Sequence, residues 1–248
     1  LLSSCSEYQK ALKSQDAAVK YTMAEKQYQA KKYKKANRLF EVIASEYSGK
    51  PQGERVYYMY GKSLYELGQY QLAAYQFERL QKLYPRSEKA AEAGFLEAKS
   101  LYNESPKYSV DQTYTYDALE KLQSFLDRYG SSEFAEEANK MTLDLVTRLQ
   151  KKDFEIAKQY DQIRDYQAAM KSLDNFLANN PGSVFKEDVR LHSAYEWAIN
   201  SVEHKKKERL ETAKEAYETL LRTFPETKYK KEAEKMLEKI NTSLKSLT

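Results

Sequence analysis

The chain is 248 residues long, enough for one large domain or two small ones, and its net charge is only +4 because 41 Lys and Arg are interspersed with 37 Asp and Glu. Without a dominant basic block, this balance argues against nucleic-acid binding, and no apolar run reaches the roughly 18 residues of a membrane-spanning helix. The chain has only 7 glycines and 5 prolines, and this scarcity of helix-breaking residues favours helices. Its mean hydropathy of -0.84 fits a solenoid with a thin core.

The first residues resemble a lipid-attachment signal. Leu2, Ser3, Ser4 and Cys5 fit the bacterial lipobox, which is Leu, two small residues and the Cys that receives a diacylglyceryl group. We therefore expect a membrane anchor at Cys5, preceded by the rest of a signal peptide, and we interpret 1–15 as a lipobox remnant and polar tether. The alternative is a chance cysteine; as the sole cysteine, it excludes an internal disulfide.

A small alanine followed four residues later by a large apolar residue recurs along the chain. The pairs are Ala36 with Phe40, Ala73 with Phe77, Ala118 with Leu122, Ala169 with Leu173 and Ala213 with Tyr217. Proline or glycine ends four of these segments, at Pro85, Gly130, Pro181 and Pro225. The alanine lets two helices approach, and the large residue fills the groove between them. The pattern predicts an all-α tetratricopeptide (TPR) superhelical solenoid of five helix-turn-helix repeats plus a C-terminal capping helix.

The expected elements follow from helical periodicity and from these stops. In chain order, helices are predicted over 16–31, 34–47, 53–67, 70–83, 88–104, 115–128, 132–161, 166–179, 187–204, 208–223 and 228–245. Polar residues and a proline predict an insertion loop over 103–115. A long helix, with Ser132 as its N-cap, is expected to join an N-terminal half (16–131, repeats 1–3) to a C-terminal half (132–248, repeats 4–5 and the cap).

Aromatic residues repeat on the first helix of each N-terminal repeat, the helix that lines the concave face of a TPR solenoid. This aromatic ladder consists of Tyr21 and Tyr28, Tyr58 and Tyr65, and Phe95 and Tyr102, with Lys62 and Lys99 between the later rings. The two rings of a pair are two helical turns apart and point the same way. One interpretation is a groove for an extended peptide, whose carboxylate the lysines hold; the other is packing between helices.

No arrangement of residues typical of an enzyme is present. His192 and His204 are too far apart to share a helix face closely, and neither has a Cys or a second His at metal-ligand spacing. Phosphate-binding and nucleophile motifs are absent from the sequence, and Trp197 is interpreted as a packing residue. The sequence therefore predicts a binding protein that is not an enzyme and needs no cofactor or metal.

The order of lipobox, tether, five loose repeats, insertion in repeat 3 and long joining helix resembles the BamD (YfiO-like) outer-membrane assembly lipoproteins. Segments 28–47, 70–85, 111–123, 147–160 and 166–181 carry the likeness. The resemblance implies a protein anchored to the cell outer membrane, facing the periplasm. It also implies binding to a BamA-type barrel subunit, to other assembly-complex lipoproteins and to unfolded outer-membrane β-barrel proteins.

Within this resemblance, the N-terminal repeats accept the C-terminal signal of unfolded barrels, and the C-terminal half contacts the barrel subunit. Arg148 matches a family arginine and is a candidate contact, with a plain surface ion pair as the alternative. Two other functions remain open: another envelope TPR scaffold lipoprotein, for cell division or peptidoglycan synthesis, and a soluble co-chaperone that grips C-terminal peptides. The lipobox argues against the co-chaperone.

Overall fold

The computed structural model describes residues 2–183, 185, 195, 199–200, 203–227 and 229–247, and in these ranges it contains eleven helices and no strand. The helices are α1 (Leu2–Lys13), α2 (Ala17–Gln29), α3 (Tyr33–Ile43), α4 (Gly53–Glu66), α5 (Tyr70–Leu83), α6 (Ala90–Glu104), α7 (Thr113–Tyr129), α8 (Ala135–Gln162), α9 (Tyr166–Asn179), α11 (Glu203–Thr223) and α12 (Lys230–Lys245). The all-α prediction is confirmed. The predicted helix 187–204 lies mostly outside the described residues.

The repeat signature marks the places where helices meet. All five repeat alanines are completely buried, and the large residues that follow them are buried as well. Gly61 on α4 extends this close approach, because a methyl group added there would lie 2.7 Å from the ring of Phe77 on α5. Small residues at these positions therefore set how closely the helices of a pair can pack.

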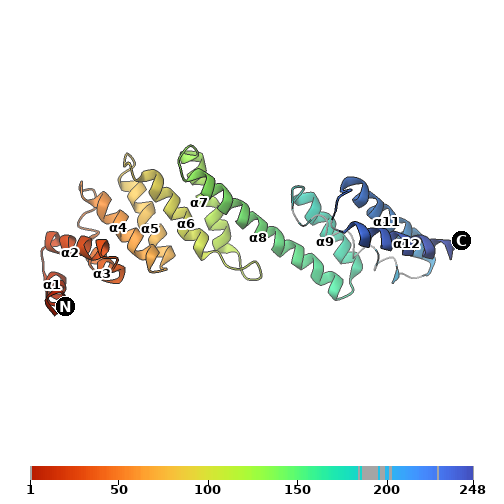
Figure 1. Cartoon of the computed structure of the whole chain (residues 1–248), viewed down its shortest axis with the longest axis horizontal. Coiled ribbons are helices and arrows are strands. Elements are labelled where there is room, and N and C mark those ends of the chain that lie inside the picture. The colour runs from red at the N-terminus through yellow and green to blue at the C-terminus, as the bar shows by residue number, and fades with distance from the viewer. Residues whose placement is uncertain are drawn as a thin grey trace. The chain divides into compact units, whose positions relative to one another are not determined.

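Two compact units make up the chain, residues 1–145 and 146–248. The predicted boundary at 131/132 falls earlier, because the first part of α8 still belongs to the first unit. In that unit, α2 to α7 pack successively in pairs of neighbouring antiparallel helices (Figure 1). Its core runs continuously from Tyr8 on α1 to Leu145 on α8.

The second unit contains the remainder of α8 and α9, α11 and α12. Phe154, Leu173 and Phe176 form one buried cluster, in which Phe154 lies 6.0 Å from Phe176 between ring centroids. A second cluster joins α11 to α12, the predicted capping helix, around Leu210 and Ile240. None of the helices within the described ranges is long and apolar enough to cross a membrane.

The insertion loop is shorter than predicted, since α6 ends at Glu104 and α7 begins at Thr113. Its geometry depends on Gln112, whose side-chain amide donates to the carbonyls of Lys107 (2.9 Å) and Val110 (3.0 Å) and whose side-chain carbonyl accepts from the Thr115 hydroxyl (2.8 Å). A buried glutamine thus replaces the backbone pairing that the loop lacks.

Two expectations about helix starts were wrong. The polar tether predicted within 1–15 is instead largely α1, in which Tyr8 packs into the core of the first unit and Ala11 is buried. Ser132 is not an N-cap, since α8 begins only at Ala135 and the buried Ser132 hydroxyl has no hydrogen-bond partner. For α1, packing of Tyr8 against the first repeat outweighed the polar local sequence.

Candidate functional site

The aromatic ladder lies on α2, α4 and α6, the first helices of the three repeats in the first unit. Five of its six rings are half-buried. Tyr21 packs 5.5 Å from Tyr47, measured between ring centroids, and Tyr65 meets Tyr70 edge to face at 5.3 Å. Each of these rings therefore has one side against its own repeat and leaves part of its surface accessible.

Ladder hydroxyls also join successive repeats. The Tyr58 hydroxyl donates to Glu92 Oε1 (2.6 Å), which belongs to the next repeat. Similarly, Asn103 Nδ2 donates to the Tyr65 hydroxyl (3.0 Å), and the Tyr102 hydroxyl donates to Asp144 Oδ2 on α8 (3.0 Å). Packing between helices therefore explains the position of the hydroxyl groups of Tyr58, Tyr65 and Tyr102, but not the exposed part of their rings.

Phe95 has a purely structural position. Only 4 % of its surface is exposed, because the ring stacks on Phe134 at 4.9 Å and packs against Phe125 at 5.8 Å. It therefore offers no face to a ligand in this structure, and its assignment as a peptide-binding residue is corrected to a core role.

Two ladder residues, Tyr28 and Tyr58, line a hollow of about 360 Å³ between α2, α4 and the residue before α6. It is lined by Tyr28, Gln29, Glu54, Arg55, Tyr58, Met59 and Lys89, and is called the inner hollow here. The rings of Tyr28 and Tyr58 form an aromatic part of its lining, and the buried Met59 adds an apolar part. Rigid aromatic surface beside polar groups is the composition that proteins use to hold extended peptide segments.

Sequence reasoning missed most of the polar residues of this hollow. Arg55 was detectable, because it lies three residues before Tyr58 and so shares its helix face. Lys89 carried no such signal, since it precedes α6 and reaches Tyr58 only through the packing of successive repeats.

Each cation of the hollow is paired with a carboxylate: Arg55 with Glu25, and Lys89 with Glu92, which is not itself a lining residue. The Glu92 carboxylate accepts from Lys89 Nζ (2.8 Å) and from the Tyr58 hydroxyl, and Lys89 Nζ also lies 5.2 Å from the Tyr58 ring centroid. Burial disfavours the charged carboxylate, but these hydrogen bonds outweigh it and lower the pKa of Glu92. Burial, reinforced by Glu92, raises the pKa of Tyr58, and burial raises the pKa of Tyr28 to about 12. Both phenols are therefore neutral hydrogen-bonding groups at physiological pH.

The two ladder lysines differ in availability. Lys99 Nζ pairs with Glu137 (2.7 Å) and lies 5.3 Å from the Phe95 ring. Lys62 Nζ lies 5.8 Å from the Tyr65 ring centroid, and within the described part of the chain it forms no ion pair. Of the two, Lys62 is the cation with capacity to bind an incoming carboxylate.

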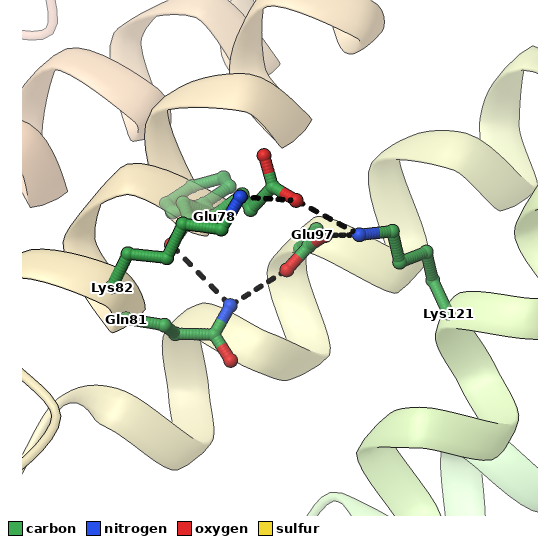
Figure 2. A network of polar contacts seen from close by, with 6 residues as sticks. Glu78, Gln81, Lys82, Glu97 and Lys121 are labelled. Carbon is green, nitrogen blue, oxygen red and sulfur yellow. Dashed lines mark hydrogen bonds and ion pairs between the residues drawn. The ribbon is translucent and has the colours of Figure 1, made fainter.

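A second hollow, of about 420 Å³, lies among α5, α6 and α7, and Figure 2 shows the polar network on its wall. Lys121 Nζ pairs with Glu97 (2.7 Å) and Glu78 (3.1 Å), Lys82 pairs with Glu78 (3.1 Å), and Gln81 donates to Glu97 (2.6 Å). Burial opposes the charged amine, yet these carboxylates raise the pKa of Lys121. Because the charged groups of this network are paired with one another, we interpret it as a structural link between three helices and not as a ligand-binding site.

The remaining predicted residues lie elsewhere. Cys5 is in α1, and Arg148 is half-buried on the α8 segment of the second unit, with a partner inside the molecule. His192 and Trp197 are outside the described residues, as is the side chain of His204. Across the described residues, no group of three His, Cys, Asp or Glu side chains is arranged to hold a metal ion.

Comparison with known proteins gives one family. A family model described as YfiO, outer membrane lipoprotein, matches residues 13–196 and 162–246, which together cover most of the chain. No curated protein matches the sequence.

Proposed function

This chain belongs to the YfiO family of outer membrane lipoproteins, and from that premise we propose that it is a non-enzymatic component of the β-barrel assembly machinery. In this proposal it faces the periplasm and binds both a BamA-type barrel subunit and unfolded outer-membrane β-barrel proteins. The observation that carries the substrate half of the proposal is the inner hollow, in which two ladder tyrosines and Met59 meet Arg55 and Lys89.

Unfolded barrel segments are extended and alternate apolar with polar side chains. The inner hollow suits the apolar side chains of such a segment, because the Tyr28 and Tyr58 rings and Met59 provide contact area, whereas Arg55 and Lys89 are already paired with carboxylates of the chain. Lys62, next along α4, supplies a positive charge for a carboxylate of the bound chain. These features support binding of unfolded substrate by the first unit.

The partner half of the proposal concerns the second unit. We assign contact with the barrel subunit to this unit and retain Arg148 as a contact residue, on the strength of the family resemblance. Other assembly lipoproteins are further partners. A lipid on Cys5 holds the chain at the membrane surface, and replacement of Cys5 by alanine is expected to release the protein from the membrane fraction.

Site-specific photo-crosslinking tests the substrate half. A photoreactive residue at Gln29, in the inner hollow, is expected to capture an unfolded outer-membrane protein during its assembly. The same residue at the exposed Gln71 on α5 is the control and is expected to capture none. Equal capture at both positions, or none at Gln29, would contradict the assignment of the hollow.

Affinity purification tests the partner half. Solubilised membranes should yield a BamA-type barrel subunit together with this protein. If they yield cell-division or peptidoglycan-synthesis proteins instead, the chain is a different envelope scaffold.

A further inference from the structure

We propose that a cluster of cations at the turn between α2 and α3 binds anionic phospholipid headgroups beside the anchored end of the chain. This basic patch consists of Lys31, Lys32, Lys34, Lys35 and Arg38. None of its residues lines the inner hollow, and it adds a second membrane contact to the proposed lipid on Cys5.

The patch is uniformly positive. Between 30 and 38 the sequence has no acidic residue, so every charged side chain is a cation. Lys31, Lys32, Lys34 and Arg38 are exposed, and Lys35 is half-buried. Within the described ranges, none of these five cations forms an ion pair with a carboxylate, in contrast to the paired lysines of α6 and α7.

Helix α1 fixes the patch next to the anchor residue. Tyr8, which is 5 % exposed, donates its hydroxyl to the Lys35 carbonyl (3.3 Å), and Lys35 Nζ lies 5.1 Å from the Tyr8 ring centroid. Cys5 precedes Tyr8 by three residues in the same helix, which is about 4.5 Å of axial rise. A lipid on Cys5 would therefore bring this turn toward the bilayer, whose surface potential extends roughly 8 Å at physiological salt.

Helix α1 adds to the positive charge. Its one acidic residue, Glu7, is paired with Lys26 (3.0 Å), whereas Lys10 and Lys13 are exposed. Helix α1 and the turn between α2 and α3 therefore both carry exposed cations without a nearby excess of acidic residues in their own segments.

Phospholipid headgroups fit this surface better than a structured ligand does. Lysine ammonium groups act as mobile point charges that attract a diffuse negative layer without fixed geometry. Each lysine near an anionic bilayer strengthens binding by about fivefold, so several together give a measurable affinity even without an acyl chain. The patch therefore adds an electrostatic contact with the headgroups to the insertion of the lipid on Cys5.

Vesicle sedimentation tests the inference. The full chain carrying Cys5→Ser, and thus no acyl group, is mixed with vesicles of phosphatidylcholine alone or of an equimolar mixture with phosphatidylglycerol. The test variant adds Lys31→Gln, Lys32→Gln and Lys34→Gln. The control variant instead adds three exposed substitutions on α12 that change the charge equally: Lys230→Gln, Lys231→Gln and Lys235→Gln.

We expect the parent chain to bind the mixed vesicles and not the neutral ones, with binding abolished by high salt. The test variant should lose affinity by roughly a hundredfold, because each of its three lysines contributes about fivefold, and the control should keep its affinity. Equal loss in both variants, or equal binding of the parent to both vesicles, would overturn the proposal. Unchanged vesicle binding together with lost binding of soluble polyglutamate would assign the patch to an acidic protein instead.

Because the chain in this assay has no acyl group and the inner hollow is intact, the result does not depend on the proposed substrate role. Crosslinking from Gln29 in the test variant should proceed as in the parent. Failure of that crosslink in both chains would count against the substrate role alone.

Discussion

Removal of the Tyr58 hydroxyl separates the structural role of the aromatic ladder from its binding role. In Tyr58→Phe, the ring in the inner hollow remains while the 2.6 Å hydrogen bond to Glu92 is lost. A hydrogen bond to a charged group contributes about 1.5–3 kcal/mol to the free energy of unfolding. Because Lys89 still binds Glu92, and the Glu92 side chain is 24 % exposed, we expect the low end, about 1.5 kcal/mol.

The stability difference between the parent chain and Tyr58→Phe is expected to depend on pH. The pKa of Glu92 is lowered in the folded protein from its ordinary value of 4.5. Its contribution to stability is therefore complete above that value and is lost as pH falls through the folded pKa. The difference between the parent chain and Tyr58→Phe should therefore be largest at neutral pH and shrink in acid. Urea unfolding followed by circular dichroism, at neutral pH and at a pH well below the lowered pKa, measures both values.

Tyr60→Phe is the matched control. Tyr60 is on the same helix and packs 6.3 Å from Phe40, but within the described chain its hydroxyl makes no hydrogen bond, so its removal should leave stability nearly unchanged. The reasoning fails if Tyr58→Phe and Tyr60→Phe destabilise equally, or if the Tyr58→Phe deficit grows in acid. Peptide binding should survive in Tyr58→Phe, because the ring that contacts the ligand is still present.

Three further predictions test the core, the polar network and the hollow. Gly61→Ala should lower the free energy of unfolding by about 1–3 kcal/mol in urea titrations, since its methyl would lie 2.7 Å from the buried ring of Phe77. Lys121→Ala should cost about 2 kcal/mol in the same assay, because it leaves the nearly buried Glu97 without its cation; the loss stays below that of a fully buried pair since Lys121 is 33 % exposed. Tyr28→Ala should weaken a barrel-derived C-terminal peptide by about tenfold in fluorescence anisotropy, because it removes one aromatic wall of the inner hollow.

Each of these changes has a matched control. Gly182→Ala adds a methyl that meets no atom within 4 Å, so a loss as large as that of Gly61→Ala would argue against overpacking. Lys140→Ala breaks an exposed pair with Glu136 and should leave stability unchanged. Tyr75→Ala removes an exposed ring on α5 outside the hollow, and if it weakens the peptide as much as Tyr28→Ala does, the binding surface is assigned wrongly.

The candidate site was only partly predictable. Tyr28 and Tyr58 were found from their repeat spacing, and both line the inner hollow. Phe95 has the same spacing but is covered by Phe134, which comes after α7 and just before α8 in the chain. Lys89 reaches the hollow from outside any repeated position, because the stacking of one repeat on the next brings it over Tyr58.

The sequence by itself determined the all-helical repeat fold, the helix pairs and the identity of their contact positions. This was possible because an alanine and a large residue four positions later lie on the same face of one helix. Helices over 70–83 and 166–179 were predicted with the bounds that the structure has. Only the tertiary structure decided which ladder rings stay accessible and whether α1 forms, since burial of Phe95 and of Tyr8 depends on neighbours far along the chain. Local spacing fixes which face a side chain is on, whereas its exposure depends on what packs against that face.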